Sequence, residues 1–225
     1  MAVPRLSYKN GRHYEHDGQR YSSVTEVLGI LSREGLAAWR EGLCARLGRE
    51  AGMAEARRIS AGSSAVGRSL HKMIEKYVGN EDPGDDPEGL EVSARSLLGA
   101  AMPYLSRIDN VAAQELPMLS RRWRVAGTVD CVAEYLGRPA IIDFKNSRRP
   151  KRREYLEGYM LQTAWYSMIW EENTGQRIDD LVVVVCNWDM TVDVACGRRA
   201  AYEAGVEDVV ERWRAERAGS GGESG

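Results

Sequence analysis

The segment that decides the fold of this chain is VAGTVDCVAEYLGRPAIIDFKNS, residues 125–147. It contains two runs rich in Val, Ile and Tyr, which are typical of β-strands. Gly137 and Pro139 lie between the runs. Glycine favours a tight turn, and proline is tolerated at the first residue of a strand, where its missing N–H costs least. The segment therefore predicts a β-hairpin.

The register of this hairpin brings charged side chains together. If the turn is centred between Leu136 and Gly137, Asp130 lies directly opposite Asp143, and opposed residues project from one face. Lys145 is two positions after Asp143, so it projects from that same face. Two carboxylates this close repel each other unless a cation lies between them.

The residues alone leave two interpretations of this charge cluster. One is a solvated surface salt bridge, which is the usual role of an Asp-x-Lys sequence on an exposed strand. The other is a site for a divalent cation, because carboxylate oxygens at this spacing suit Mg²⁺ or Mn²⁺ better than they suit a soft metal. Phe144 points to the opposite face, toward a core.

Three segments together resemble a known family. Gly127-Thr128-Val129-Asp130, Ile141-Ile142-Asp143-Phe144-Lys145 and Gln162-Thr163-Ala164-Trp165-Tyr166 are similar to motifs of the PD-(D/E)xK nuclease superfamily. The likeness is to the RecB-like exonucleases, and among them to the mitochondrial genome maintenance exonucleases and their phage and bacterial relatives. It extends over residues 22–188. A lone Asp-x-Lys is a weak signal, whereas the ordered set is specific: His71, Glu115, Asp130, Asp143, Lys145, Gln162 and Tyr166.

The resemblance implies an α/β fold, a restriction-endonuclease-like αβββαβ core with a mixed sheet flanked by helices and a helical N-terminal elaboration. The patterning agrees with this order: it predicts a hairpin over 12–21 and strands over 111–119, 181–187 and 191–195. It also predicts one or two helices over 33–59 and helices over 63–77, 91–108, 154–173 and 200–217. We expect one domain over 1–217, comprising the elaboration (22–108), the catalytic core (111–196) and a C-terminal helix (199–217), before a disordered tail (218–225).

The resemblance also implies a metal site. It assigns Mg²⁺ or Mn²⁺ to His71, Asp130, Asp143, the Phe144 carbonyl and Glu115. On the residues alone, His71 is equally explained by a bond to Glu75 one turn later, and Glu115 by an edge strand beside Pro117.

The resemblance also assigns catalytic roles to residues around this metal site. By resemblance, Lys145 orients or deprotonates a water, and Gln162 positions Lys145 or the scissile phosphate. Asp130 and Asp143 complete the catalytic set.

Nucleic-acid contacts are expected on four segments. A basic run at 148–153 follows Lys145 closely and predicts a phosphate cradle, although charge runs are usually solvated. In the helix at 154–173, tyrosines and Gln162 recur at spacings of three and four and share a face. The expected contacts are Tyr166, Tyr159, Arg148, Arg149, Lys151, Arg68, Ser23 and Thr25; for Ser23, capping of a helix is a sufficient alternative.

Composition limits the kinds of protein and of binding site that the chain can form. The 225 residues are 43% hydrophobic with net charge −2, so any nucleic-acid surface must come from local patterning. No apolar run is long enough to span a membrane and no signal segment is evident, so we expect a cytoplasmic protein. The four cysteines form no close pair, so we expect neither an iron–sulfur cluster nor a zinc site.

These observations favour a metal-dependent DNA exonuclease that hydrolyses phosphodiester bonds. By resemblance, its substrate is single-stranded DNA with a free end, in replication, repair or recombination. Two alternatives remain at this stage: a structure-specific endonuclease on the same core, and a non-catalytic nucleic-acid-binding module. A pure binding module has no need of the charge cluster at Asp130, Asp143 and Lys145, which argues against the last.

Overall fold

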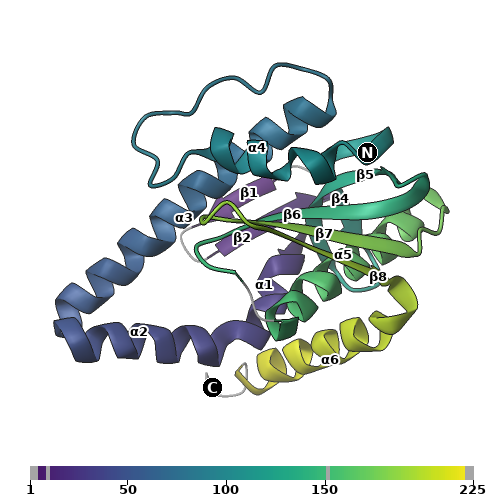
Figure 1. The fold of residues 1–225 in the computed structure, drawn as a ribbon. Coiled ribbons are helices and arrows are strands. Elements are labelled where there is room, and N and C mark those ends of the chain that lie inside the picture. Colours follow the sequence, from purple (N-terminus) through teal and green to yellow (C-terminus); the bar gives the residue numbers. More distant parts are fainter. Residues whose placement is uncertain (1–4, 9–10, 151–152, 221–225) are drawn as a thin grey trace.

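The computed structural model describes residues 5–8, 11–150 and 153–220. One mixed eight-stranded sheet is flanked by helices on both faces (Figure 1). Its strands are β1 (Arg5–Tyr8), β2 (Gly11–His16), β3 (Gln19–Ser23), β4 (Ile108–Ser120), β5 (Val125–Tyr135), β6 (Arg138–Ser147), β7 (Asp180–Asn187) and β8 (Val192–Arg198). Its α-helices are α1 (Val24–Leu28), α2 (Arg33–Leu47), α3 (Arg49–Val78), α4 (Ala94–Leu105), α5 (Arg153–Thr174) and α6 (Glu203–Ser220).

The predicted central hairpin is confirmed. Strands β5 and β6 pair antiparallel from Cys131–Ile142 to Tyr135–Arg138, which is the expected register. Leu136 and Gly137 form the two-residue turn with φ angles of 54° and 76°. Two successive positive φ angles are typical of the hairpin turn whose twist matches that of the strands.

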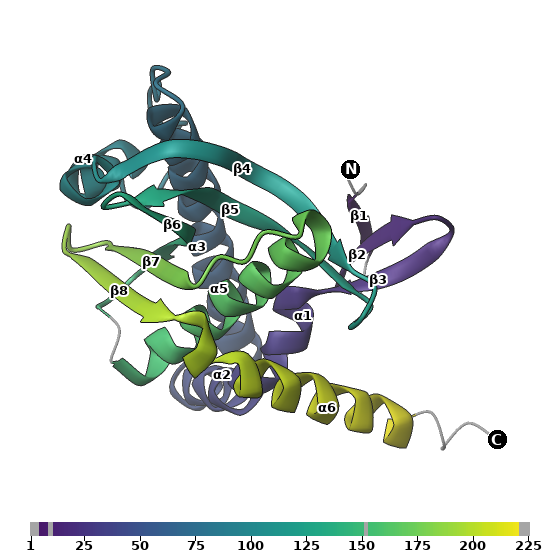
Figure 2. The same cartoon turned by 90° about the vertical axis from the view of Figure 1, so that its right-hand side faces the viewer.

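Helices cover the two faces of the sheet and define two hydrophobic cores. Helix α5, with α1 and α6, packs on one face, while α3 and α4 pack on the other. Figure 2 shows α5 in front of the sheet and α3 behind it. Strand β7 is buried on both faces, which explains its run of four valines: Val183 and Val185 join one core, Val182 and Val184 the other.

The N-terminal hairpin belongs to the same sheet. Strands β2 and β3 form the predicted hairpin, and β1 extends it by a third strand. A short parallel pairing of Ser22 with Val125 and Ser23 with Ala126 joins β3 to β5. The sequence did not predict this connection, because two residue pairs a hundred positions apart leave no local signal.

The structure corrects two predicted boundaries. Residues 33–59 belong to two helices, one of the two alternatives expected, because the first ends at Leu47 and Gly48 adopts a φ of +82°. The second does not end near residue 59 but merges with the helix expected over 63–77. At the C-terminus, α6 continues to Ser220, so the first three residues of the expected disordered tail are helical. None of the described helices is both long and apolar enough to cross a membrane.

Candidate active site

Strand β5 changes its pairing partner within its first residues, and we call the gap at residues 127–130 the fork. One edge of β5 pairs with β4 along most of its length. The other edge pairs with β3 at Val125 and Ala126 and then with β6 from Cys131 onward. Residues 127–130 lie between these pairings, where β3 and β6 separate. Asp130 is therefore placed in the opening, where its nearly buried side chain, 10% exposed, lines a pocket.

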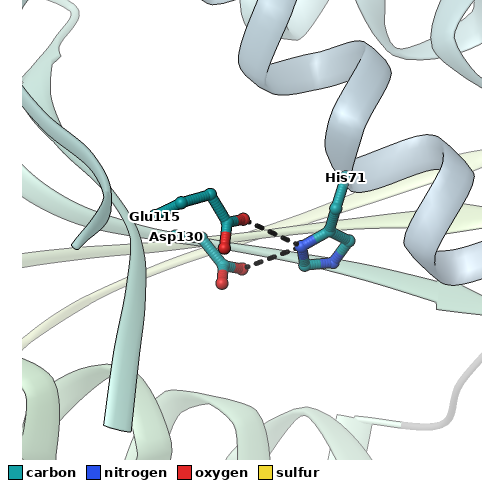
Figure 3. A group of neighbouring side chains, drawn as sticks. All are labelled: His71, Glu115 and Asp130. Carbon is teal, nitrogen blue, oxygen red and sulfur yellow. Dashed lines mark ion pairs between the residues drawn. The ribbon is translucent and has the colours of Figure 1, made fainter. Parts of the chain in front are cut away.

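A histidine and two carboxylates converge at this fork. Glu115 lies between the pairs Gln114–Cys131 and Leu116–Val129, and thus opposite Asp130, with a φ of +45°. His71 approaches from α3 (Figure 3): its Nδ1 is 3.6 Å from Glu115 Oε1 and 3.8 Å from Asp130 Oδ2. One ligand atom from each of the three residues lies within 4.8 Å of the others.

Strand β6 adds an ion pair beside this cluster. Lys145 Nζ is 2.5 Å from Asp143 Oδ2, and Asp143 is 1% exposed. The Gln162 side-chain amide donates to Asp143 Oδ1 at 3.2 Å. The Phe144 backbone N–H donates to Asp130 Oδ2 at 2.8 Å. Backbone and side chains of β6 and α5 thus hold both aspartates in place.

Burial and the neighbouring carboxylates together set the pKa values of the site. Burial, with repulsion from Asp143, raises the pKa of Asp130 to about 6. Burial alone would lower the pKa of His71, but its contacts with Glu115 and Asp130 raise it. Burial would likewise lower the pKa of Lys145, yet the two aspartates raise it. Lys145 therefore stays protonated at neutral pH.

The donor set fits a divalent cation. Three carboxylates (Glu115, Asp130 and Asp143) surround this site with one ammonium, Lys145, which pairs with the buried Asp143 Oδ2. Carboxylate oxygens suit Mg²⁺ and Mn²⁺, and an imidazole nitrogen is compatible with Mn²⁺. The clustered group is His71, Glu115 and Asp130; Asp143, expected as a further ligand, instead contacts Lys145 and Gln162.

A pocket of about 630 Å³ opens over these residues. It is lined from α3, from the fork and from α5, and it includes four of the expected nucleic-acid contacts: Ser23, Thr25, Arg68 and Tyr166. Ser23 also accepts a hydrogen bond from Glu26 N at 2.9 Å, so the capping role is confirmed.

Of the basic cradle expected over 148–153, only residues 148–150 have described side chains, so the cradle as a whole stays a prediction. Arg148 forms an ion pair with Glu91 at 2.7 Å and packs on the Trp188 ring, so its charge is already compensated. Arg149 is exposed but does not line the pocket. Lys151 lies outside the described residues. Tyr159 does not line the pocket either; its ring centroid is 5.5 Å from Lys145 Nζ.

Several pocket residues were missed from the sequence. Ser64 and Lys72 lie four positions to either side of Arg68 on α3, and this helical spacing was a usable signal. Gly127 carries a different constraint: a Cβ there would lie 2.7 Å from the Tyr166 ring. The ring can therefore approach the fork only because residue 127 has no side chain.

Comparison with known proteins agrees with this geometry. A sequence profile described as the PD-(D/E)XK nuclease superfamily matches residues 42–219. The chain is similar to mitochondrial genome maintenance exonuclease 1 of Mus musculus (30% identity over 117 residues) and of Xenopus tropicalis (30% over 118). Each match covers 52% of this chain but only 32% of the relative.

A solved structure of a proposed exonuclease from Eubacterium rectale aligns with a TM-score of 0.44 and 11% identity, over 65% of this chain and 64% of that one. The profile match is decisive, because it spans well over half of the chain and contains the fork, the ion pair on β6 and His71. This chain belongs to the PD-(D/E)XK nuclease superfamily.

Proposed function

We propose that this protein is a metal-dependent deoxyribonuclease that removes nucleotides from a free end of single-stranded DNA. One observation carries the proposal: His71, Glu115 and Asp130 converge at the fork, beside the Asp143–Lys145 pair, in one open pocket. Members of this superfamily use divalent metals, and a salt bridge alone does not require three carboxylates in a largely buried site.

His71, Glu115 and Asp130 are the residues that would hold the cation. When bound, it would supply Lewis-acid chemistry, polarising a phosphoryl oxygen and lowering the pKa of a coordinated water. Asp143 joins them in the proposal if the cation displaces Lys145 from its oxygen. The Phe144 carbonyl remains a predicted ligand that no observed contact tests.

The chain's own groups orient and stabilise the reacting phosphate. Lys145 acts as a hydrogen-bond donor and a positive charge for the phosphate in the transition state, and Asp143 and Asp130 favour its protonated form against the effect of burial. Gln162 fixes Asp143, and the Phe144 N–H fixes Asp130, so both carboxylates keep their orientation. Thr128 lines the same pocket and is available to contact the strand, whereas Tyr166 also lines the pocket but is 3% exposed and stays a predicted contact.

The requirement for a free end is supported by the names of the relatives, which are exonucleases, although the match covers about a third of their length. The test compares linear with circular single-stranded DNA of the same sequence, each with Mg²⁺ or Mn²⁺ and with EDTA. We expect loss of the linear strand alone, and only with metal.

The Lys145→Ala variant should abolish that loss, whereas Arg212→Ala, which removes a cation from α6, should not. Cleavage of both substrates would refute the free-end requirement and favour an endonuclease. Absence of cleavage of any strand would refute the nuclease activity and leave a binding module.

A further inference from the structure

One face of α3 is basic and leads into the pocket. Successive spacings of three, four, four and four residues place five exposed side chains on one side of the helix: Arg57, Ser60, Ser64, Arg68 and Lys72. Between Glu50 and Glu75 this face carries no acidic residue. From Arg57 to Lys72 it extends about 22 Å, at 1.5 Å per residue.

The cations of this face have no compensating partner in the described part of the chain. No ion pair, hydrogen bond or ring contact involves Arg57, Arg68 or Lys72 there. Elsewhere on α3 the situation differs, because Arg58 bonds Glu55 at 2.8 Å and approaches Glu91 at 3.3 Å. The face is thus a row of cations without compensating anions.

Its inner end lies beside the acidic cluster without contacting it. Ser64, Arg68 and Lys72 line the same pocket as Glu115 and Asp130, yet neither cation forms an ion pair with those carboxylates. The pocket therefore has an acidic part, suited to a metal ion, and a basic part along α3. In Figure 1 the outer part of α3 extends away from the sheet toward α2.

We propose that this basic face of α3 binds the sugar–phosphate backbone of the DNA strand that continues away from the scissile bond. Arg68 and Lys72 would hold phosphates next to the cleavage site, Arg57 would hold a more distant one, and the serine hydroxyls would donate hydrogen bonds between them. The inference rests on the proposed function, because it takes DNA as the ligand.

Salt dependence measures the number of phosphate contacts directly. For single strands, the slope of log K against log salt is about −0.7 for each phosphate neutralised. The triple variant Arg57→Gln, Arg68→Gln, Lys72→Gln should therefore bind a fluorescent strand with a slope shallower by about 2. Between roughly 50 and 200 mM salt, wild type should then lose about 20-fold more affinity than the triple variant does.

The binding is measured by anisotropy in EDTA, so that DNA is not degraded. Arg212→Gln on α6 removes the same charge far from α3 and should leave the slope unchanged. The charge-keeping triple variant Arg57→Lys, Arg68→Lys, Lys72→Arg should restore it. An unchanged slope in the glutamine triple variant, or no binding of DNA by wild type at low salt, would overturn the proposal.

Substrates of different length test whether Lys72 contacts the strand near the cleavage site and Arg57 contacts it farther away. Lys72→Gln should lower kcat/KM for a trinucleotide and for a strand of about 20 nucleotides, because its contact lies near the cleavage site. Arg57→Gln should lower only the value for the long strand. Equal effects of Arg57→Gln on both substrates would overturn the assignment. Absence of all cleavage by wild type would instead refute the proposed function, while the salt slopes would still decide whether α3 binds DNA.

Discussion

Substituting Gly67 by alanine should loosen the attachment of α3 to strand β6. A Cβ at Gly67 would lie 2.5 Å from Nδ2 of Asn146, the residue directly after Lys145. Asn146 cannot simply rotate away, because its oxygen accepts from Trp188 Nε1 at 3.1 Å and its amide donates to the Ser63 carbonyl at 3.4 Å. The substitution must displace either the helix or this amide.

The size of the effect follows from two opposing terms. Replacing glycine by alanine inside a helix gains about 1 kcal/mol of helix propensity. Displacing Asn146 breaks two hydrogen bonds, each worth about 1 kcal/mol net. Gly67→Ala should therefore lower the free energy of unfolding by about 1 kcal/mol, and Asn146→Ala, which also loses both bonds, by about 2 kcal/mol.

The double variant separates this mechanism from general damage. With Asn146→Ala present, the new methyl group no longer meets Nδ2, so Gly67→Ala contributes only its helix propensity and becomes stabilising by about 1 kcal/mol. The coupling energy of the cycle should then be about 2 kcal/mol. Urea denaturation of the four proteins with an unchanged m-value measures it. Additive effects, within about 0.5 kcal/mol, would refute the reasoning.

Three further outcomes follow from the site. Lys145→Met should lower kcat by at least 100-fold, in line with removal of one charge-stabilising donor, as steady-state kinetics would show. It should also lower Tm in thermal melts without metal, because the buried Asp143 carboxylate loses its cation. Because the raised pKa of Asp130, about 6, makes the folded state bind more protons than the unfolded state, the metal-free protein should gain stability as pH falls from 7 to 5. Protons compete with metal there, so Mn²⁺ affinity measured by calorimetry should fall below pH 6. Asp130→Asn should reduce the gain in stability and leave the part that His71 contributes, because Glu115 also raises the pKa of His71. Gly127→Ala should force the Tyr166 ring from the fork and destabilise the protein by about 1–3 kcal/mol in urea denaturation, whereas an unchanged midpoint would contradict the contact.

The hairpin and its charge cluster were predictable from sequence because both depend on local rules. Turn residues fix the register, and the period of two in a strand then fixes which side chains share a face. Asp143 and Lys145 accordingly form an ion pair. That Glu115 lies opposite Asp130 was harder to predict from sequence, because it depends on the pairing of β4 with β5. The family motif had nevertheless indicated Glu115.

The features that sequence did not predict depend on distant partners. Arg148 was expected to bind phosphate, but it pairs with Glu91, which precedes it by more than fifty residues. The fork requires β3 to pair with β5, and no local pattern signals this. The continuity of α3 through Gly62 is also a tertiary effect: a Cβ there would lie 2.0 Å from the Glu91 carboxylate, and packing overrides the low propensity of glycine.

Helix α3 packs on Asn146 of β6, places His71 at the metal site and presents the basic face. These three roles are compatible because each uses a different side of the helix. At about 100° per residue, Gly67 faces the contact with Asn146, His71 is displaced from it by about 40°, and Arg68 and Lys72 follow further around the helix. Rotation of α3 about its axis would therefore move the histidine and the basic face together. Loosening the Gly67–Asn146 contact should weaken both Mn²⁺ affinity and DNA affinity, while substitutions on the basic face should weaken DNA affinity alone. That difference distinguishes a residue that positions the helix from one that contacts the substrate.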